Sequence, residues 1–304
     1  MSAARRVRAA VAGALVAALL AAGAVAQPAP FAVESQATTL AGARVTVDVY
    51  RPLETLAESA DAPDAQMAAA PVAIVAHGFS RDRTRGRDLG RELAAAGIVA
   101  IVPDLPNLVD YWGNAAAIRD VVAQLERGAF GLPPTWRGQL VLIGTSAGGV
   151  ATLIAASKLP GIAGWIGLDP VDRSGTAALA AAKVSAPAIV LLGDPSVCNL
   201  FGSGRSIAQA VPTLVRAQRL HGASHCDFEG PTNSFCRNVC GKGARGMDET
   251  VRRETVDAAL AMLRERAGPP SAASTQPLRP DDAELPPASP PDAPAAPAPS
   301  DDRP

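Results

Sequence analysis

Histidine is scarce in this chain of 304 residues and occurs only three times, as His77, His221 and His225. Because histidine is the side chain that most often serves as a general base near neutral pH, these three positions are the candidates for the base of a hydroxyl nucleophile. The chain also lacks an excess of charge, since its formal net charge is −1. This balance gives no indication of nucleic-acid binding or of attraction towards polyanions.

The first 26 residues have the composition of a secretory signal peptide. Basic residues at the start precede an apolar run at 9–25, and Ala24-Val25-Ala26 forms an A-x-A cleavage site. The alternative, an N-terminal membrane anchor, is disfavoured because the apolar run is short and polar, proline-containing sequence follows it. We therefore expect a secreted or periplasmic protein with no stable membrane span after cleavage.

Cysteine is also rare, and its four copies lie within the last third of the part expected to fold, as Cys198, Cys226, Cys236 and Cys240. In an oxidising compartment an even number of cysteines indicates disulfides, and four cysteines allow three pairings. We favour the pairs Cys198–Cys226 and Cys236–Cys240. A metal site is the less favoured alternative, because the single C-x-x-x-C spacing and the lack of a second histidine cluster do not suit zinc.

The rest of the sequence divides into one folded region and a tail. Residues 268–304 consist mainly of Pro, Ala, Ser and Asp, with almost no large apolar side chains to build a core, so we expect a disordered tail. Residues 27–267 make up roughly 240 positions, enough for one sizeable α/β domain. They are too few for that domain together with a large separate cap.

A strand, a tight turn and a helix are predicted around Ser146. The apolar run 140–143 ends at Gly144-Thr145-Ser146-Ala147-Gly148, and helix-forming residues follow from Val150. The spacing G-x-S-x-G is typical of a serine on a sharp strand-to-helix turn, where glycines are needed because the flanking backbones crowd each other. Ser146 is therefore the candidate nucleophile, which requires a base, an acid to orient that base, and donors for an oxyanion.

Strands and helices alternate along the folded region. We expect a surface excursion at 53–70, helices at 88–96, 114–126 and 249–264, and strands at 44–50, 71–76, 98–102, 140–143, 164–168, 188–192 and 214–220. This order favours an α/β fold with a mostly parallel central sheet and helices on both faces. Ligands bind beyond the carboxyl ends of such strands, where the sequence places His77, Asp104, Ser146, Asp169, Asp194 and His225.

His225 is the favoured base among the three histidines. It lies in the loop after the last expected strand, where a serine hydrolase built on this sheet carries its histidine. His221, four residues earlier, is the alternative. His77 belongs to a His-Gly turn that precedes the nucleophile, and we expect it to shape that loop instead.

The residues alone do not identify which acid orients the histidine base. Asp169 and Asp194 each end a strand and are each followed by proline, and Asp172 is a third candidate; any of them could orient a histidine through its Nδ1 proton. Two backbone amides, those of Phe79 and Ala147, are predicted to form the oxyanion hole.

Four segments resemble the α/β-hydrolase superfamily, and within it the chlorophyllase and platelet-activating-factor acetylhydrolase-like branch. They are the H-G-hydrophobic turn at 77–79, the G-x-S-x-G-G elbow at 144–149, the G-L-D-P-V-D strand end at 167–172, and H-C-D-F-E at 225–229 with cysteines downstream. The resemblance covers residues 71–240 and implies a triad of Ser146, Asp169 and His225, so it favours Asp169 over Asp194.

Two positions depart from that branch. Thr145 stands where those enzymes typically have a histidine, and Ala147 replaces a bulkier residue. The resemblance therefore does not extend to chlorophyll or phospholipid as the substrate, and it leaves the triad unchanged.

The sequence thus predicts a monomeric serine esterase that requires no cofactor or metal. Its substrate is expected to be a small-molecule or lipid-like carboxylic ester with a short or medium acyl chain, and lipids or polyesters extend that range. Tyr111 and Trp112 are the candidate substrate-binding residues beside an open cleft. The alternatives are a thioesterase or peptidase that uses the same triad, and a non-catalytic, envelope-associated binding protein that keeps the fold.

Overall fold

The computed structural model describes residues 30–53, 71–133, 138–230, 232 and 234–267. The signal peptide expected at 1–26, the tail expected at 268–304, and all but the first residue of the excursion at 53–70 lie outside the described residues. These three expectations stay predictions, as do the domain limits at 27 and 267.

Within the described residues, eight strands form one sheet in the order β1-β2-β4-β3-β5-β6-β7-β8. The first two pairings, β1 with β2 and β2 with β4, are antiparallel, and every later pairing is parallel. The strands are β1 (Phe31–Leu40), β2 (Ala43–Pro52), β3 (Val72–Ala76), β4 (Val99–Pro103), β5 (Leu140–Thr145), β6 (Gly164–Leu168), β7 (Ala188–Leu192) and β8 (Leu214–Arg219). The mostly parallel sheet predicted from the sequence is confirmed.

The hairpin β1–β2 adds a strand that the sequence pattern does not indicate. The strand expected at 44–50 is β2, and its hairpin partner β1 forms the edge of the sheet. Ala41 and Gly42 connect the two with φ of 48° and 80°, the left-handed backbone that a two-residue hairpin turn needs. Three successive polar residues, Glu34, Ser35 and Gln36, hide the alternation of β1 in the sequence.

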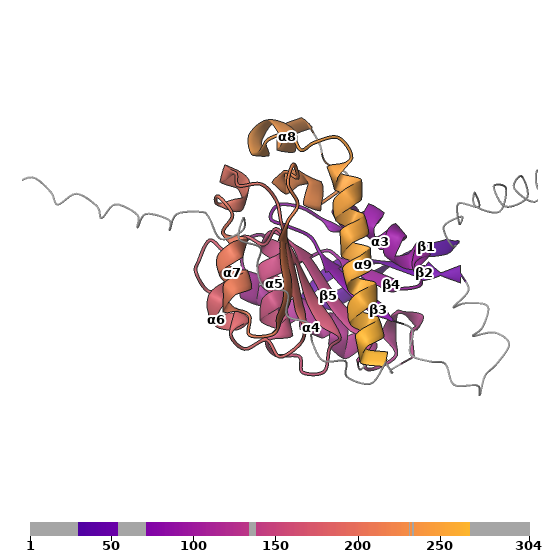
Figure 1. The fold of residues 1–304 in the computed structure, drawn as a ribbon. Helices are drawn as coiled ribbons and strands as arrows, with labels where there is room; N and C mark the ends of the chain where they lie inside the picture. The colour runs from indigo at the N-terminus through magenta and orange to yellow at the C-terminus, as the bar shows by residue number, and fades with distance from the viewer. Residues whose placement is uncertain (1–29, 54–70, 134–137, 231, 233, 268–304) are drawn as a thin grey trace, which may run out of the picture.

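Helices cover both faces of the sheet (Figure 1). Helices α4 to α7 pack on one face, and α3 and the long C-terminal α9 pack on the other. The helices are α3 (Arg87–Ala95), α4 (Tyr111–Leu125), α5 (Ala147–Ala156), α6 (Ala177–Ala181), α7 (Gly204–Ala210), α8 (Ser234–Cys240) and α9 (Met247–Ala267). None of the described helices is both long enough and apolar enough to cross a membrane.

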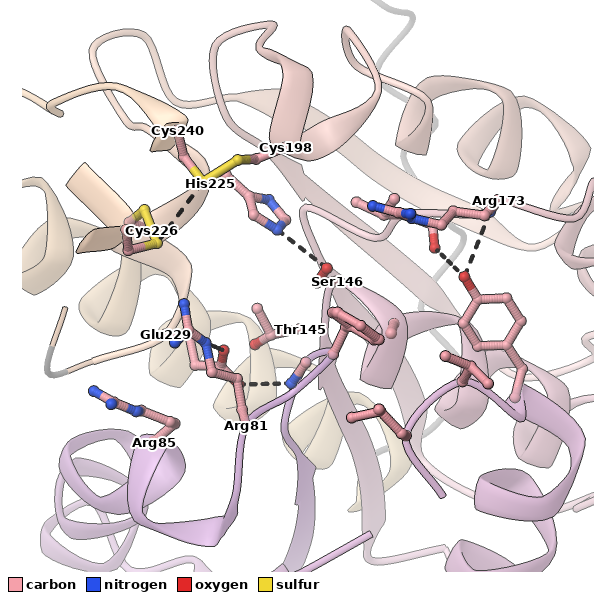
Figure 2. A pocket seen from close by; sticks show the side chains of 18 of the residues that line it. Arg81, Arg85, Thr145, Ser146, Arg173, Cys198, His225, Cys226, Glu229 and Cys240 are labelled. Atoms are coloured by element: carbon pink, nitrogen blue, oxygen red, sulfur yellow. Dashed lines mark hydrogen bonds and ion pairs between the residues drawn. A yellow bond between two sulfur atoms is a disulfide. The ribbon is translucent and has the colours of Figure 1, made fainter. Parts of the chain in front are cut away.

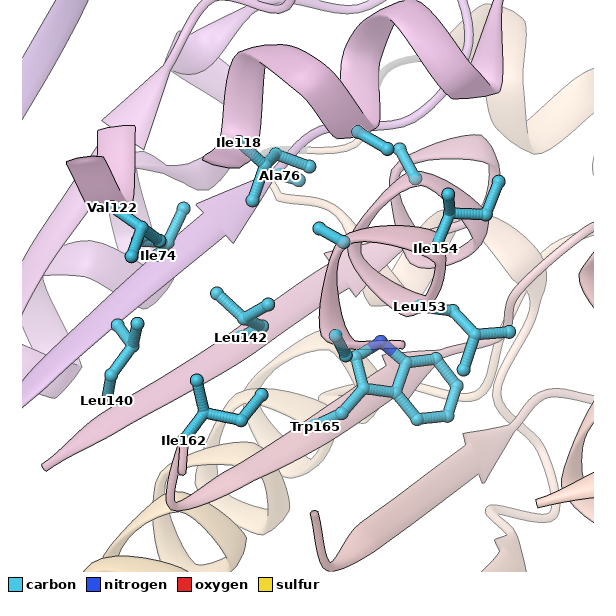
Figure 3. Packing of buried hydrophobic residues seen from close by; sticks show 14 of the residues in the cluster. Ile74, Ala76, Ile118, Val122, Leu140, Leu142, Leu153, Ile154, Ile162 and Trp165 are labelled. Carbon is cyan, nitrogen blue, oxygen red and sulfur yellow. The ribbon is translucent and has the colours of Figure 1, made fainter. Parts of the chain in front are cut away.

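The five inner parallel strands are buried along their whole length, which explains their continuous apolar sequences. Every residue of β3, β4, β5, β6 and β7 is buried. Such runs are expected where helices cover both faces of a parallel sheet. Figure 3 shows one face, where Ile74 and Leu142 of the sheet lie beneath Ile118 of α4 and Leu153 of α5.

Helix α4 begins three residues earlier than the sequence predicts. The Asp110 carboxylate accepts a hydrogen bond from the Trp112 amide at 2.9 Å, so Asp110 caps the helix and Tyr111 is its first residue. Tyr111 and Trp112 therefore lie on the first turn of a helix rather than in a loop. This turn fixes both side chains relative to the sheet.

A buried hydrogen-bond chain joins strand β6 to the elbow helix α5. Trp165 of β6 is fully buried, and its indole Nε1–H donates to Thr152 Oγ1 at 3.0 Å. The Thr152 hydroxyl in turn lies 2.9 Å from the carbonyl oxygen of Gly148 and 3.0 Å from that of Gly149. Thr152 therefore links the packing of the sheet to the first turn of the helix that follows Ser146.

Replacing Thr152 by valine tests this link, because valine keeps the shape of the side chain but accepts no hydrogen bond. The Trp165 N–H is then buried without a partner, so we expect Thr152→Val to lower the free energy of unfolding by about 1–3 kcal/mol. Thr152→Ser keeps the hydroxyl and loses one methyl group, which costs about 0.8 kcal/mol. Urea denaturation measures both, and a valine variant as stable as the wild type contradicts the link.

Candidate active site

Ser146 sits on a sharp turn between β5 and α5. Its backbone has φ 54° and ψ −120°, a conformation that non-glycine residues rarely adopt. A Cβ atom on Gly144 would clash with the Gly148 carbonyl oxygen, and one on Gly148 would clash with the His77 carbonyl oxygen. The two glycines of the G-x-S-x-G pattern are thus required by close backbone approach.

The structure brings Ser146, His225 and Asp169 together in one hydrogen-bonded chain. His225 Nε2 lies 3.1 Å from Ser146 Oγ (Figure 2). His225 Nδ1 lies 2.6 Å from Asp169 Oδ2. A proton on Nδ1 that donates to the carboxylate leaves Nε2 free to accept the serine proton. The three side chains come from the ends of β5 and β6 and from the loop after β8. This is the geometry that general-base activation of a serine needs.

Asp169 is fully buried and is held by more than the histidine. Its Oδ1 accepts the Gly193 amide at 3.1 Å, and Oδ2 accepts Asn199 Nδ2 at 3.0 Å. Asn199 is itself fully buried, and its own Oδ1 accepts the amides of Ser196 at 2.8 Å and Gly202 at 3.0 Å. The loop after β7 thus builds a rigid polar support behind the carboxylate.

Sequence reasoning missed Asn199. An isolated asparagine in a loop carries no pattern that marks it as a partner of a residue thirty positions earlier. Its one distinguishing feature in the sequence is the neighbouring Cys198, which the structure places in a disulfide.

The alternative acids and the alternative base lie elsewhere. Asp194 accepts the Gly222 amide at 2.8 Å and lies 3.7 Å from the exposed His221, so these two form a surface pair apart from Ser146. Asp172 accepts the Ala177 amide at 2.8 Å at the start of α6. The histidine that contacts the Ser146 hydroxyl is His225. The carboxylate that contacts the His225 ring is that of Asp169.

His77 shapes the turn that carries Phe79. Its Nε2 accepts the Leu105 amide at 2.9 Å, so the ring proton is on Nδ1, which donates to the Gly78 carbonyl oxygen at 2.9 Å. Burial lowers the pKa of His77, which favours this neutral form. Because C=O and N–H point in opposite directions in a trans peptide, fixing the Gly78 carbonyl turns the Phe79 N–H away from the His77 ring.

Phe79 and Ala147, whose amides are the predicted oxyanion donors, both line the pocket that contains Ser146. Within the described part of the chain, the structure assigns neither amide a hydrogen-bond acceptor. Ala147 is the first residue of α5, where helix geometry leaves the N–H without an intrahelical partner. Both amides thus belong to residues that line the pocket with Ser146, and the oxyanion hole stays a prediction.

The pocket has a volume of about 580 Å³, and Tyr111 and Trp112 both line it. The Tyr111 hydroxyl donates to the Val171 carbonyl oxygen at 3.2 Å and accepts the Arg173 amide at 3.4 Å, so it anchors the segment after β6. Trp112 is half exposed at the rim. The Arg173 guanidinium lies over the Phe79 ring, 5.9 Å from its centroid, and both residues line the pocket.

The predicted disulfide pairing is wrong. The structure pairs Cys198 with Cys240 and Cys226 with Cys236, with Cα–Cα distances of 5.4 and 6.0 Å. Cys236 and Cys240 lie one turn apart on α8, and their side chains reach two different loops, the Val197–Asn199 turn and the His225–Phe228 turn. The helix therefore ties both loops to itself instead of closing on itself.

These disulfides also argue against a metal site formed by the cysteines. The sulfur atoms of Cys226, Cys236 and Cys240 lie within 4.8 Å of one another, a spacing that could hold an ion. Each of these sulfurs is already bonded in a disulfide, and no described cysteine is free. A disulfide sulfur is not the thiolate that zinc requires.

Comparison with known proteins identifies the fold class. No protein-family model and no curated protein sequence matches the chain. Among solved structures, a dienelactone hydrolase from Anabaena variabilis matches with a TM-score of 0.57 and 15% sequence identity, over 76% of this chain and 98% of that one. The chain therefore has the α/β-hydrolase fold, as its sequence resemblance implies. The chlorophyllase and acetylhydrolase-like branch stays a prediction.

Two matched substitutions separate the candidate acids. Asp169→Asn removes the carboxylate that holds the Nδ1 proton of His225, so we expect kcat for an ester substrate to fall by about three to four orders of magnitude. Asp194→Asn leaves an oxygen that can still accept the Gly222 amide, so we expect kcat within about threefold of the wild type. Steady-state kinetics on both folded variants measure these two values of kcat. A larger loss of kcat in Asp194→Asn than in Asp169→Asn contradicts the role of Asp169.

Proposed function

We propose that this protein is a serine esterase that hydrolyses carboxylic esters through an acyl-enzyme intermediate. The observation that carries the proposal is the continuous chain from Ser146 through His225 to the buried Asp169. Ser146 and His225 line a pocket together with Phe79 and Ala147, whose amides have no acceptor among the described residues. A nucleophile, a base, an orienting acid and oxyanion donors together are the parts that acyl transfer needs.

In the proposed reaction, His225 Nε2 removes the proton of Ser146 as Oγ attacks the ester carbonyl carbon. The amides of Phe79 and Ala147 donate to the resulting oxyanion, and Asp169 stabilises the imidazolium of His225. The imidazolium then protonates the departing alkoxide, which leaves an acyl group on Ser146. His225 then removes a proton from water as the water oxygen attacks the acyl carbon. When the bond from this carbon to Ser146 Oγ breaks, the imidazolium returns the proton to Oγ, which releases the acid and regenerates Ser146 and neutral His225.

The rim of the pocket supports an apolar substrate. Phe79, Leu108, Val109 and Trp112 all line the pocket, and they are between 48% and 70% exposed. Large apolar side chains left open beside a nucleophile favour acyl or alcohol groups that bury them on binding. We therefore propose esters with short to medium acyl chains as the substrate class. Lipids or polyesters would be larger substrates of the same kind. Tyr111 and Trp112 are the proposed substrate-binding residues.

The two disulfides support the proposed secreted or periplasmic location, since such bonds persist mainly in oxidising compartments. The site is assembled from one chain, and the proposed mechanism uses no cofactor, metal ion or partner protein.

Hydrolysis of a p-nitrophenyl ester series by the mature protein tests the proposal. We expect turnover by the wild type and a loss of about four to six orders of magnitude in kcat for Ser146→Ala, because removal of the nucleophile abolishes the acyl-enzyme route. Circular dichroism establishes that the variant is folded. Equal activity of the two proteins contradicts the assignment of Ser146.

The same assay with matched oxygen esters, thioesters and anilides separates the proposed esterase from a thioesterase or peptidase. A folded wild-type protein without turnover on any of them favours the non-catalytic alternative.

A further inference from the structure

Glu229 lies beneath the turn that carries Phe79, although it is four residues beyond His225 in the sequence. The Gly78 amide donates a hydrogen bond to Glu229 Oε1 at 2.6 Å. The Glu229 side chain is 11% exposed, and Figure 2 shows it beside Arg81, close to Thr145 and Ser146. A carboxylate from the loop of the base thus reaches the turn of the predicted oxyanion hole.

Gly78 is held at both of its polar groups. Its N–H donates to Glu229 and its carbonyl oxygen accepts from the His77 ring, at 2.6 and 2.9 Å. A residue without a side chain has wide freedom in φ and ψ, so these two contacts select one orientation among many. The peptide that follows Gly78 carries the Phe79 N–H, and the direction of that donor is therefore set by the two contacts together.

The space around Gly78 is also closely filled. A Cβ atom at this position would lie 3.2 Å from Ser146 Cβ and 3.3 Å from Glu229 Oε2. The Thr145 hydroxyl donates to the Phe228 carbonyl oxygen at 3.2 Å, so the segment that carries Glu229 is fastened to the nucleophile turn as well. The loop that carries His225, the turn that carries Ser146 and the turn that carries Phe79 are thus joined through residues 228 and 229.

Arg81 balances the charge of this buried carboxylate. Its Nε lies 3.5 Å from Glu229 Oε2. Burial raises the pKa of Glu229, while the hydrogen bond from Gly78 and the positive charge of Arg81 act in the opposite direction. In either protonation state the carboxyl group keeps an oxygen that can accept the Gly78 amide.

We propose that Glu229 is a positioning residue that fixes the Phe79 amide in the oxyanion hole and couples it to the loop of His225. This inference rests on the proposed esterase function. Glu229 also lines the pocket, but nothing in the proposed acyl transfer requires it to exchange a proton. Its direct contact with the turn that carries Phe79 is the hydrogen bond from Gly78.

Two substitutions of similar size separate the hydrogen bond from packing. Glu229→Met fills the same space without an acceptor, and Glu229→Gln keeps an oxygen for the Gly78 amide. Because loss of a single oxyanion donor costs about 10²- to 10³-fold in kcat, we expect a misdirected donor in Glu229→Met to cost about 10- to 100-fold. We expect KM within about threefold of the wild type, and Glu229→Gln within about fivefold in kcat.

Rates are expressed per Ser146 that reacts with a fluorophosphonate, which removes any contribution from unfolded protein. A boronic acid that forms a tetrahedral adduct on Ser146 adds a second readout, and its affinity should fall by the same factor as kcat. A merely structural role would lower the reactive fraction and leave both quantities unchanged. Glu229→Ala replaces the methionine variant should the latter not fold.

The outcomes separate the two proposals. Turnover by the wild type with unchanged kcat in Glu229→Met overturns the positioning role and leaves the esterase intact. Equal losses in the methionine and glutamine variants also overturn it, because the charge rather than the acceptor would then matter. Absence of Ser146-dependent turnover in the wild type overturns the esterase, and the role of Glu229 falls with it.

Discussion

The strained backbone at Ser146 is the constraint on which the site depends. A serine at positive φ persists only where its surroundings hold it, and here the close approach of Gly144 and Gly148 to neighbouring backbone does so. The same turn opens α5, whose Thr152 is tied to the buried Trp165 of the sheet. The position of the nucleophile is therefore determined by the packing of the core, and the other candidate groups are arranged around it.

The opposite side of the site is built from the loops after β7 and β8. The disulfides Cys198–Cys240 and Cys226–Cys236 fasten these loops to α8. The loop after β8 is also anchored in the core by Leu220, Ala223 and Phe228. Each disulfide is next to a polar residue of the site, since Cys198 precedes Asn199 and Cys226 follows His225. Covalent bonds thus add to the apolar packing that holds the base and the support of the acid in place.

Much of this could be predicted from the sequence, because it depends on local patterns. The inner strands are apolar over their whole length and end at the residues that meet above the sheet, so Ser146, Asp169 and His225 can be placed at one edge without coordinates. In the sequence, only the family resemblance distinguishes Asp169 from Asp194, since both end a strand before a proline. The structure separates them by their contacts, with the buried Asp169 facing His225 and Asp194 facing the surface.

The remaining features depend on contacts between distant segments, which no local pattern records. The disulfide pairing follows from where α8 lies, and a short helix that bridges two loops cannot be located from cysteine spacing. Asn199 and Glu229 act through loops that meet only in the folded chain. The early start of α4 depends on the Asp110 cap, which the apolar periodicity of the helix does not mark.

Covalent labelling tests the central claim, the activation of Ser146 by His225, most directly. The folded, mature protein is treated with a fluorophosphonate, and the adduct is located by peptide mass spectrometry, with His225→Gln treated in parallel. Activation predicts one adduct per chain on Ser146 and labelling at least a hundredfold slower in the variant, within the roughly 10²- to 10⁴-fold contribution of a general base. Folded protein that carries no adduct on Ser146, or equal labelling of both proteins, would contradict it.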